Sequence, residues 1–222
     1  MTEKKQSKFS KLLGDPRGYF FQKSSQWSSL FYRKWCSLYV YLWGRLKGVE
    51  FNGFPDCWGC LYLVRHPFST IRIGRNFKAN SSFKSNHIGM FTRSRITTNA
   101  KDAVVEIGDH VGISAATISA FQKISIGDYT LIGGNVLITD SDWHAVDPAE
   151  RMADSPNVKT AEIKIGKNVF FGTRAVILKG TVIGDHSVIG AGSVVSGVIP
   201  PNVIACGNPC VVVKKIEPCF VV

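Results

Sequence analysis

The chain has 222 residues, 45% of them hydrophobic and 19% charged, which is typical of a globular protein and excludes disordered, collagen-like and coiled-coil chains. The formal net charge is +11, and residues 1–50 hold 10 Lys/Arg against 3 Asp/Glu, so the basic character belongs mainly to the start of the chain. This charge suits an anionic membrane surface or an anionic substrate. We expect no nucleic-acid partner, because no recognition motif accompanies the charge.

The start of the chain also bears on cellular location. Residues 1–10 are charged, and no apolar stretch with a small-residue cleavage site follows them, so they do not resemble a secretion signal. No apolar run reaches about 18 residues, the length that a membrane-spanning helix needs. We therefore expect a cytoplasmic protein. The basic segment 1–48 leaves open a peripheral contact with the inner membrane.

Residues 1–48 divide into a basic arm and an amphipathic helix. Residues 1–26 are rich in Lys and Ser and predict a loosely attached arm. Residues 27–47 predict a helix, because apolar side chains recur along one face at spacings of three and four: Trp27, Leu30, Phe31, Trp35, Leu38, Leu42 and Leu46. We favour packing of this stripe against the rest of the chain. The alternative is a helix that lies on a membrane surface, where Trp, Tyr, Lys and Arg are common.

A six-residue repeat follows. From residue 165 onward an aliphatic or aromatic residue stands at every sixth position, usually with a small residue after it: Ile165, Phe171, Ile177, Ile183, Ile189 and Val195. An earlier block has the same spacing, with one interruption: Ile107, Ile113, Ile126, Ile132 and Ile138. Each hexad predicts one short strand and one turn, and three hexads make a triangular coil whose core rests on its neighbours. The sequence therefore predicts an all-β, parallel β-helix over residues 49–217.

The repeat stops between Trp143 and Ala161 and resumes in phase at Ile165. An insertion that leaves the phase unchanged predicts a loop thrown out from the coils, at residues 143–162, and such loops usually serve a function. Residues 218–222 form a short C-terminal tail.

His144 is the candidate catalytic residue, because it stands at the mouth of this loop and imidazole suits the removal of a proton from a hydroxyl near neutral pH. Asp140 and Asp142 lie just upstream and are expected to hold its tautomer and support the imidazolium. Polar or aromatic positions on coils near the loop are candidate acceptor contacts: Asn135, Ser114 and Trp143.

Three segments carry a resemblance to a known family. Residues 165–177 (IGKNVFFGTRAVI), residues 189–196 (IGAGSVVS) and residues 207–210 (GNPC) resemble motifs of the hexapeptide-repeat acyltransferases. The likeness extends over roughly residues 70–217 and is strongest to the branch of maltose and galactoside O-acetyltransferases and polysaccharide-biosynthesis acetyltransferases. The resemblance implies that the β-helix is left-handed, against the usual crossover rule.

The resemblance also implies acetyl-CoA as co-substrate and a homotrimer with active sites between subunits. In such enzymes the backbone N–H at the position of Thr173, after Gly172, polarises the thioester, and Ala191 and Ser196 lie along the pantetheine arm. Basic residues that would meet the phosphates are Arg174, Lys179, Lys214 and Lys215. One departure is Val211, which stands where the family commonly has a basic residue.

The function that these features predict is an acetyl-CoA-dependent O-acetyltransferase, acting on a hydroxyl of a sugar or lipid-linked saccharide by direct transfer in a ternary complex. One alternative is an N-acyltransferase that acts on an amino-sugar nucleotide, with the same fold and co-substrate. Another is a non-catalytic β-helix scaffold, which would be expected to lack His144. No metal is expected, since Cys57 and Cys60 have no second, similarly spaced pair and fit ordinary thiols better.

Overall fold

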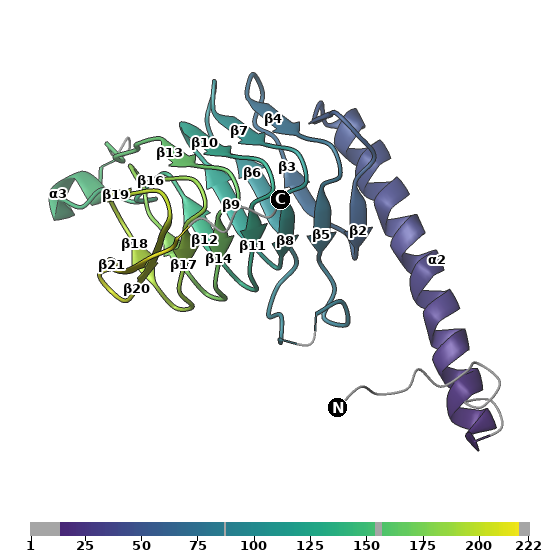
Figure 1. The fold of residues 1–222 in the computed structure, drawn as a ribbon. Helices are drawn as coiled ribbons and strands as arrows, with labels where there is room; N and C mark the ends of the chain where they lie inside the picture. Colours follow the sequence, from purple (N-terminus) through teal and green to yellow (C-terminus); the bar gives the residue numbers. More distant parts are fainter. Residues whose placement is uncertain (1–13, 87, 154–156, 218–222) are drawn as a thin grey trace.

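A computed structural model describes residues 14–86, 88–153 and 157–217 of the chain. Its strands form three sheets whose members follow one another in the same order in every coil, which makes a parallel β-helix (Figure 1). Its hand is the left-handed one that the resemblance implies. The first sheet consists of β1 (Glu50–Phe51), β4 (Thr70–Ile73), β7 (Val104–Ile107), β10 (Lys123–Ile126), β13 (Ile163–Ile165), β16 (Val182–Ile183) and β19 (Val198–Ile199).

The other two sheets complete each coil. The second sheet consists of β2 (Asp56–Trp58), β5 (Lys78–Asn80), β8 (Gly112–Ser114), β11 (Leu131–Ile132), β14 (Phe170–Phe171), β17 (Val188–Ile189), β20 (Val203–Cys206) and β21 (Val211–Lys215). The third sheet consists of β3 (Tyr62–Val64), β6 (Arg95–Thr98), β9 (Thr117–Ala120), β12 (Leu137–Thr139), β15 (Val176–Ile177) and β18 (Val194–Val195). Neighbouring strands are parallel, except that β21 runs antiparallel to β20.

The hexads form the core, as the sequence predicts. Ile107, Ile126 and Ile165 stand in register on successive strands of the first sheet and are nearly inaccessible to solvent. Phe171 and Ile189 stack in the same way in the second sheet. Because every coil places its apolar residue over that of the coil before, burial on both sides stabilises each turn of the solenoid.

The β-helix begins earlier than the clear hexads indicate. Phe51, Cys57 and Leu63 are buried, one in each sheet, and form a complete first coil. Residues 49–70 are therefore part of the solenoid.

Helix α2 (Pro16–Leu46) is longer than the predicted helix 27–47, and it begins within the predicted arm. Asp15 caps its first turn by accepting the backbone N–H of Gly18 at 2.8 Å, and proline at the first position is already restricted to a helical φ. Residues 14–26 are therefore not an arm. The remainder of the predicted arm, residues 1–13, lies outside the described part of the chain.

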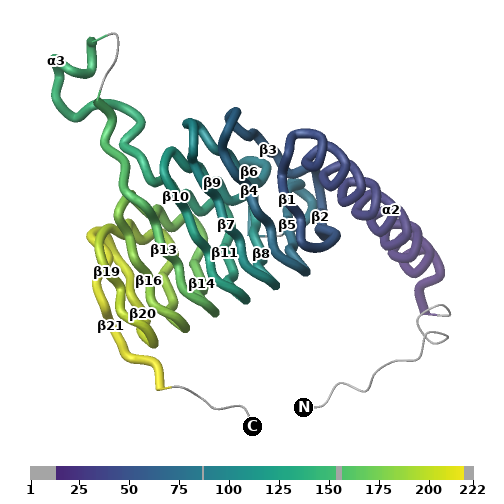
Figure 2. Tube along the Cα trace, turned by 90° about the horizontal axis from the view of Figure 1, so that it is seen from above, coloured from purple at the N-terminus to yellow at the C-terminus, as the bar shows by residue number. Residues whose placement is uncertain are grey.

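The favoured packing of the α2 stripe is wrong. The residues that α2 buries are Cys36, Ser37, Val40 and Gly44, on the face opposite the large apolar side chains. These small side chains let the helix approach β1 and β2 closely; a Cβ added at Gly44 would lie 2.7 Å from the Phe51 ring. Figure 2 shows α2 at the end of the solenoid, where it covers the exposed first strands.

Polar contacts also fix α2 to the first coil. Arg33 forms an ion pair with Asp56, and the Ser37 hydroxyl accepts the backbone N–H of Cys57 at 2.8 Å. Within the described ranges, no helix combines the length and the apolar content that crossing a bilayer requires.

Two insertions interrupt the coils. Residues 140–162 leave the solenoid between β12 and β13, include the short helix α3 (Pro148–Arg151) and project from the coils (Figure 2). Residues 81–94 form a second insertion between β5 and β6, which the sequence analysis did not identify. Each insertion belongs to a different corner of the triangular coil.

Candidate functional site

The corner between the second and third sheets holds four of the predicted co-substrate residues. Here each coil turns directly above the turn of the coil before, so the backbones lie very close. A Cβ added at Gly172 would collide with the backbone N of Ala191, which stacks on it. Only glycine fits at this position, and the turn therefore brings Gly172, Thr173, Arg174 and Ala191 together.

Thr173 has a backbone N–H that is free to bind a ligand. Its side-chain hydroxyl donates to the Gly134 carbonyl at 2.6 Å, and its own carbonyl accepts the N–H of Gly192 at 2.9 Å. Among the described residues, no acceptor takes the Thr173 N–H. A free N–H on a rigid turn can polarise a carbonyl group, as the resemblance implies.

The same corner borders an open pocket of about 390 Å³ that Ser114 and Thr173 line. The Ser114 hydroxyl accepts hydrogen bonds from the side-chain amides of Asn80 at 3.1 Å and Asn86 at 3.3 Å. Ser114 therefore lies at the pocket beside Thr173, within a small polar network, and not near the 140–162 loop where the sequence analysis expected it.

The Asn135 side chain forms hydrogen bonds with the inserted loop 81–94. Its side-chain oxygen accepts the N–H of Phe91 at 3.0 Å, and its amide nitrogen donates to the Gly89 carbonyl at 3.1 Å. Arg174 contacts the same loop, because its guanidinium lies 4.8 Å from the centre of the Phe91 ring. Both side chains hold the inserted loop 81–94 against the corner, and this loop is the part of the site that sequence reasoning missed.

We expect Asn135→Ala to loosen this loop. Two side-chain hydrogen bonds are lost, and the substitution should raise the rate of proteolytic cleavage within residues 86–94 about tenfold. The measurement is limited proteolysis with fragment identification by mass spectrometry. Asn168→Ala is the matched control, because Asn168 has the same left-handed backbone (φ 53° against 60°) and makes no such side-chain bonds to a loop. Equal cleavage of the two variants would show that Asn135 does not hold the loop.

The corner between the third sheet and the next coil's first sheet holds the predicted catalytic residues. His144 is exposed on the loop, and among the described residues nothing forms a hydrogen bond with its imidazole. Trp143 precedes it with a left-handed backbone, and its indole N–H donates to the Thr139 hydroxyl at 3.0 Å. The Trp143 ring also meets Phe121 edge-on at 5.0 Å, so Trp143 fixes the base of the loop on the solenoid.

The two carboxylates do not orient His144 in this chain. Asp140 is fully buried, and its two oxygens accept the backbone N–H groups of Phe121 at 2.7 Å and Gln122 at 2.8 Å. Burial raises the pKa of Asp140 above its ordinary value, although the backbone N–H groups oppose the shift. Asp140 therefore anchors the loop to the preceding coil and is not available to support an imidazolium.

Asp142 is engaged by Lys179, whose ammonium lies 2.7 Å from the carboxylate. This ion pair ties the loop to the next coil along the axis. It also means that Lys179, predicted to meet the phosphates of CoA, already has an anionic partner. The remaining predicted co-substrate residues lie apart from Thr173. Ser196 stacks one coil beyond Leu178 at this corner. Lys214 and Lys215 are exposed on β21.

The predicted residues therefore form two groups. Thr173 and its neighbours lie at one corner, His144 lies at the other, and the third sheet separates the corners. In a single chain the predicted base and the predicted thioester site do not meet.

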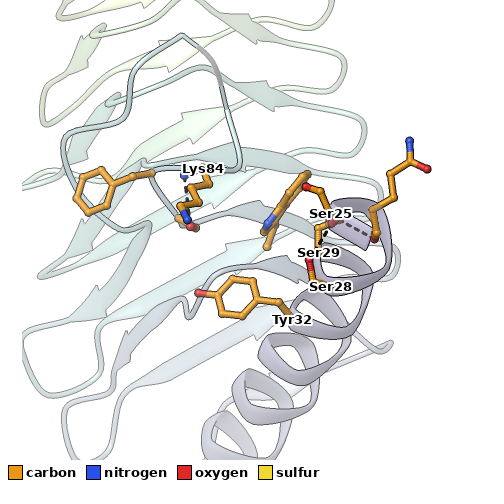
Figure 3. Close-up of a pocket in the computed structure, with 9 residues that line it drawn as sticks. Ser25, Ser28, Ser29, Tyr32 and Lys84 are labelled. Carbon is orange, nitrogen blue, oxygen red and sulfur yellow. Dashed lines mark hydrogen bonds between the residues drawn. The ribbon is translucent and has the colours of Figure 1, made fainter. Parts of the chain in front are cut away.

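A larger pocket, of about 740 Å³, lies between α2 and the 81–94 loop (Figure 3). None of the predicted site residues lines it. Its lining includes Trp58 and several polar side chains that Figure 3 labels: Ser25, Ser28, Ser29, Tyr32 and Lys84. Two of these hydroxyls are satisfied within the helix, since Ser28 donates to the Ser25 carbonyl at 3.0 Å and Ser29 to that of Gln26 at 2.8 Å.

Comparisons with known proteins agree with this architecture. A family model described as bacterial transferase hexapeptide (six repeats) matches residues 162–197. A galactoside O-acetyltransferase from Escherichia coli (strain K12) is 40% identical over 114 residues, which cover 50% of this chain and 56% of that protein. WbbJ from the same organism, provisionally assigned as a lipopolysaccharide biosynthesis O-acetyl transferase, is 34% identical over 118 residues, which cover 50% and 57%. The chain thus matches little more than half the length of these curated relatives.

A solved structure shows the same fold. A mutant of AntD, an N-acyltransferase from Bacillus cereus in complex with dTDP and coenzyme A, covers 80% of this chain and 89% of its own, with a TM-score of 0.58 and 18% identity. The stacked hexads, the repeat model that matches residues 162–197 and the similar sequences make this chain similar to the hexapeptide-repeat transferases.

Proposed function

We propose that the chain is an acetyl-CoA-dependent acetyltransferase that acts on a hydroxyl of a sugar or saccharide precursor. The observation that carries this proposal is the free backbone N–H of Thr173 on a crowded glycine turn, at the edge of an open pocket. The similar E. coli sequences are named O-acetyl transferases, which supports a hydroxyl acceptor.

The proposed reaction needs a base, a carbonyl-polarising group and a leaving thiol. His144 removes the proton of the acceptor hydroxyl as its oxygen attacks the thioester carbonyl. The Thr173 N–H stabilises the negative charge that develops on the carbonyl oxygen. When the carbon–sulfur bond breaks, the protonated His144 returns its proton to the departing thiolate of CoA. The acetyl group passes directly to the acceptor, with both substrates bound together.

A trimer would complete the site. His144 and Thr173 lie at different corners of one chain, and three chains around one axis would place the His144 corner of each beside the Thr173 corner of the next. The projecting 140–162 loop has the position to reach a neighbour in this arrangement (Figure 2). Sedimentation equilibrium should therefore show a particle of three chains; a stable monomer with full activity would contradict this proposal.

The phosphates of CoA would meet exposed cations along the solenoid. Lys214 and Lys215 lie on β21, where both side chains are exposed, and Arg174 lies beside the pocket. Lys179 contributes only if it exchanges Asp142 for the ligand. The strand β21 is thus the principal candidate for phosphate contact.

The test of the proposed function is acetyl-CoA turnover, measured as free CoA released, across a panel of sugar acceptors. The panel includes hexosides, an amino-sugar nucleotide and a lipid-linked saccharide, and each reaction is compared with one that lacks acceptor. Release that depends on a hydroxyl acceptor supports O-acetyl transfer. Release only with the amino-sugar nucleotide would instead identify an N-acyltransferase, and failure to bind acetyl-CoA would support a scaffold.

A further inference from the structure

Helix α2 presents a large apolar surface that faces away from the solenoid. All seven members of the predicted stripe are between 44% and 79% exposed, although each is aromatic or leucine: Trp27, Leu30, Phe31, Trp35, Leu38, Leu42 and Leu46. These residues form what we term the outer stripe. Contiguous exposed surface of this kind usually marks an interaction site.

A row of cations accompanies the outer stripe. Lys23, Lys34 and Arg45 are spaced eleven residues apart, which is three helical turns, so they line up along one border of the stripe. Residues 16–46 contain five basic residues and no Asp or Glu. Of the five, only Arg33 takes part in an ion pair within the described residues.

We infer that the outer stripe is a docking surface for an anionic lipid bilayer, with α2 lying in the plane of the interface. Trp and Phe rings and leucines enter the boundary between headgroups and acyl chains, while Lys and Arg meet the lipid phosphates. Lys34 is exposed and has no partner among the described residues, so it is available for such a contact.

Charge favours a bilayer over the other candidate occupants. A second copy of α2 would bring two all-basic helices together with no carboxylate between them. A nucleic acid would match the cations but would leave Leu38, Leu42 and Leu46 without apolar partners. An anionic bilayer satisfies both parts of the surface at once, because its headgroups are charged and its interior is apolar.

The position of α2 in the fold agrees with this role. All four residues that α2 buries lie in its second half, which is fixed to the first coil. The first half continues beyond the strands at the end of the solenoid (Figure 1). The helix can therefore lie on a surface without uncovering the core, and the binding does not depend on the acetyl-transfer reaction.

The test is co-sedimentation of the full chain with vesicles of phosphatidylcholine, alone or mixed with phosphatidylglycerol. We expect binding to the mixed vesicles that weakens as salt is added, and little binding to phosphatidylcholine alone. The combined variant Trp27→Ser/Phe31→Ser/Trp35→Ser should lose at least about tenfold in affinity, because it removes aromatic surface from the interface. Lys34→Ala should lose about fivefold.

Tyr129→Ser is the matched control. Tyr129 is also an exposed aromatic residue, at 55%, but it lies on a turn of a later coil, away from α2. The Tyr129→Ser variant should bind the mixed vesicles as the wild type does. Circular dichroism checks that the stripe variant keeps its fold, which is expected because the replaced side chains face outward.

Three results would overturn the inference. In the first, the wild type stays in solution with both kinds of vesicle. In the second, the stripe variant binds as tightly as the wild type. In the third, sedimentation velocity shows that the stripe variant breaks up an assembly of the wild type that does not bind vesicles, which would place the outer stripe between copies of the chain.

Discussion

Replacing His144 by Asn lowers kcat for acetyl transfer by at least about a hundredfold, while acetyl-CoA still binds. The expectation follows from the proposed mechanism, in which His144 takes the proton of the acceptor as its oxygen attacks. Asn can form hydrogen bonds but cannot accept and return that proton near neutral pH. The measurement is the initial rate of CoA release with the best acceptor of the panel, beside the affinity for acetyl-CoA.

The loss should leave the fold unchanged. His144 is exposed, so its replacement breaks no hydrogen bond among the described residues. A thermal midpoint equal to that of the wild type would confirm this. The effect on rate can then be assigned to chemistry and not to stability.

His186→Asn is the matched control. His186 lies on a solenoid turn with a left-handed backbone, φ 60°, which Asn also adopts readily. It has no place in the proposed mechanism, so its variant should keep the wild-type rate. If His144→Asn and His186→Asn are equally active, His144 is not the base and the proposed mechanism fails.

The sequence predicts the solenoid well because its signal is repeated. Each hexad must place an apolar side chain in the narrow core, so the same requirement recurs every six residues. The stacked positions of successive coils show it, as at Ile107, Ile126 and Ile165. The first coil is less obvious. Phe51, Cys57 and Leu63 also stand six apart, but Asn52, Trp58 and Val64 follow them, where later coils often have a small residue.

Helix α2 shows why periodicity alone cannot choose the buried face. Its large apolar residues make the stronger pattern, yet close approach to β2 requires small side chains such as those of Cys36, Val40 and Gly44. The aromatic stripe is too bulky for that contact and remains outside. The distance between α2 and the first coil therefore decides which face is buried, and the sequence pattern does not contain that distance.

The site residues show a similar limit. Asp140, Asp142 and Asn135 are polar residues near the loop, and the sequence analysis assigned them to catalysis and acceptor binding. In the structure their side chains form hydrogen bonds that hold the inserted loops on the coils. Their partners lie up to 46 residues away in sequence, and only the coil register brings them together.

Asp140→Ala should be the most destabilising of the loop substitutions. The variant leaves the backbone N–H groups of Phe121 and Gln122 without acceptors in a buried place, at a cost of about 1–3 kcal/mol each. For a chain of this size we expect a fall in the thermal midpoint on the order of 10 °C. The measurement is differential scanning calorimetry of the variant and the wild type.

Asp147→Ala is the comparison that separates the effect of buried hydrogen bonds from the effect of their number. Asp147 also accepts two backbone N–H groups, from Ala149 at 2.8 Å and Glu150 at 3.0 Å, but it caps the short helix α3 on an exposed part of the loop. Water can replace those two bonds, so the variant should lose only about 1 kcal/mol, or about 2–4 °C. Equal losses in the two variants would show that burial of the Asp140 contacts is not what stabilises the base of the loop.

The contribution of Asp140 should also depend on pH. Burial raises the pKa of Asp140 in the folded chain, so between the unfolded and folded values the folded state holds more protons than the unfolded state. Stability from this group is therefore complete below the unfolded pKa and declines as pH rises through the folded pKa. We expect the difference in stability between wild type and Asp140→Ala to be largest in acid and to narrow toward neutral pH. A difference that widens with rising pH would mean that the hydrogen bonds from Phe121 and Gln122 outweigh burial and hold the carboxylate charged.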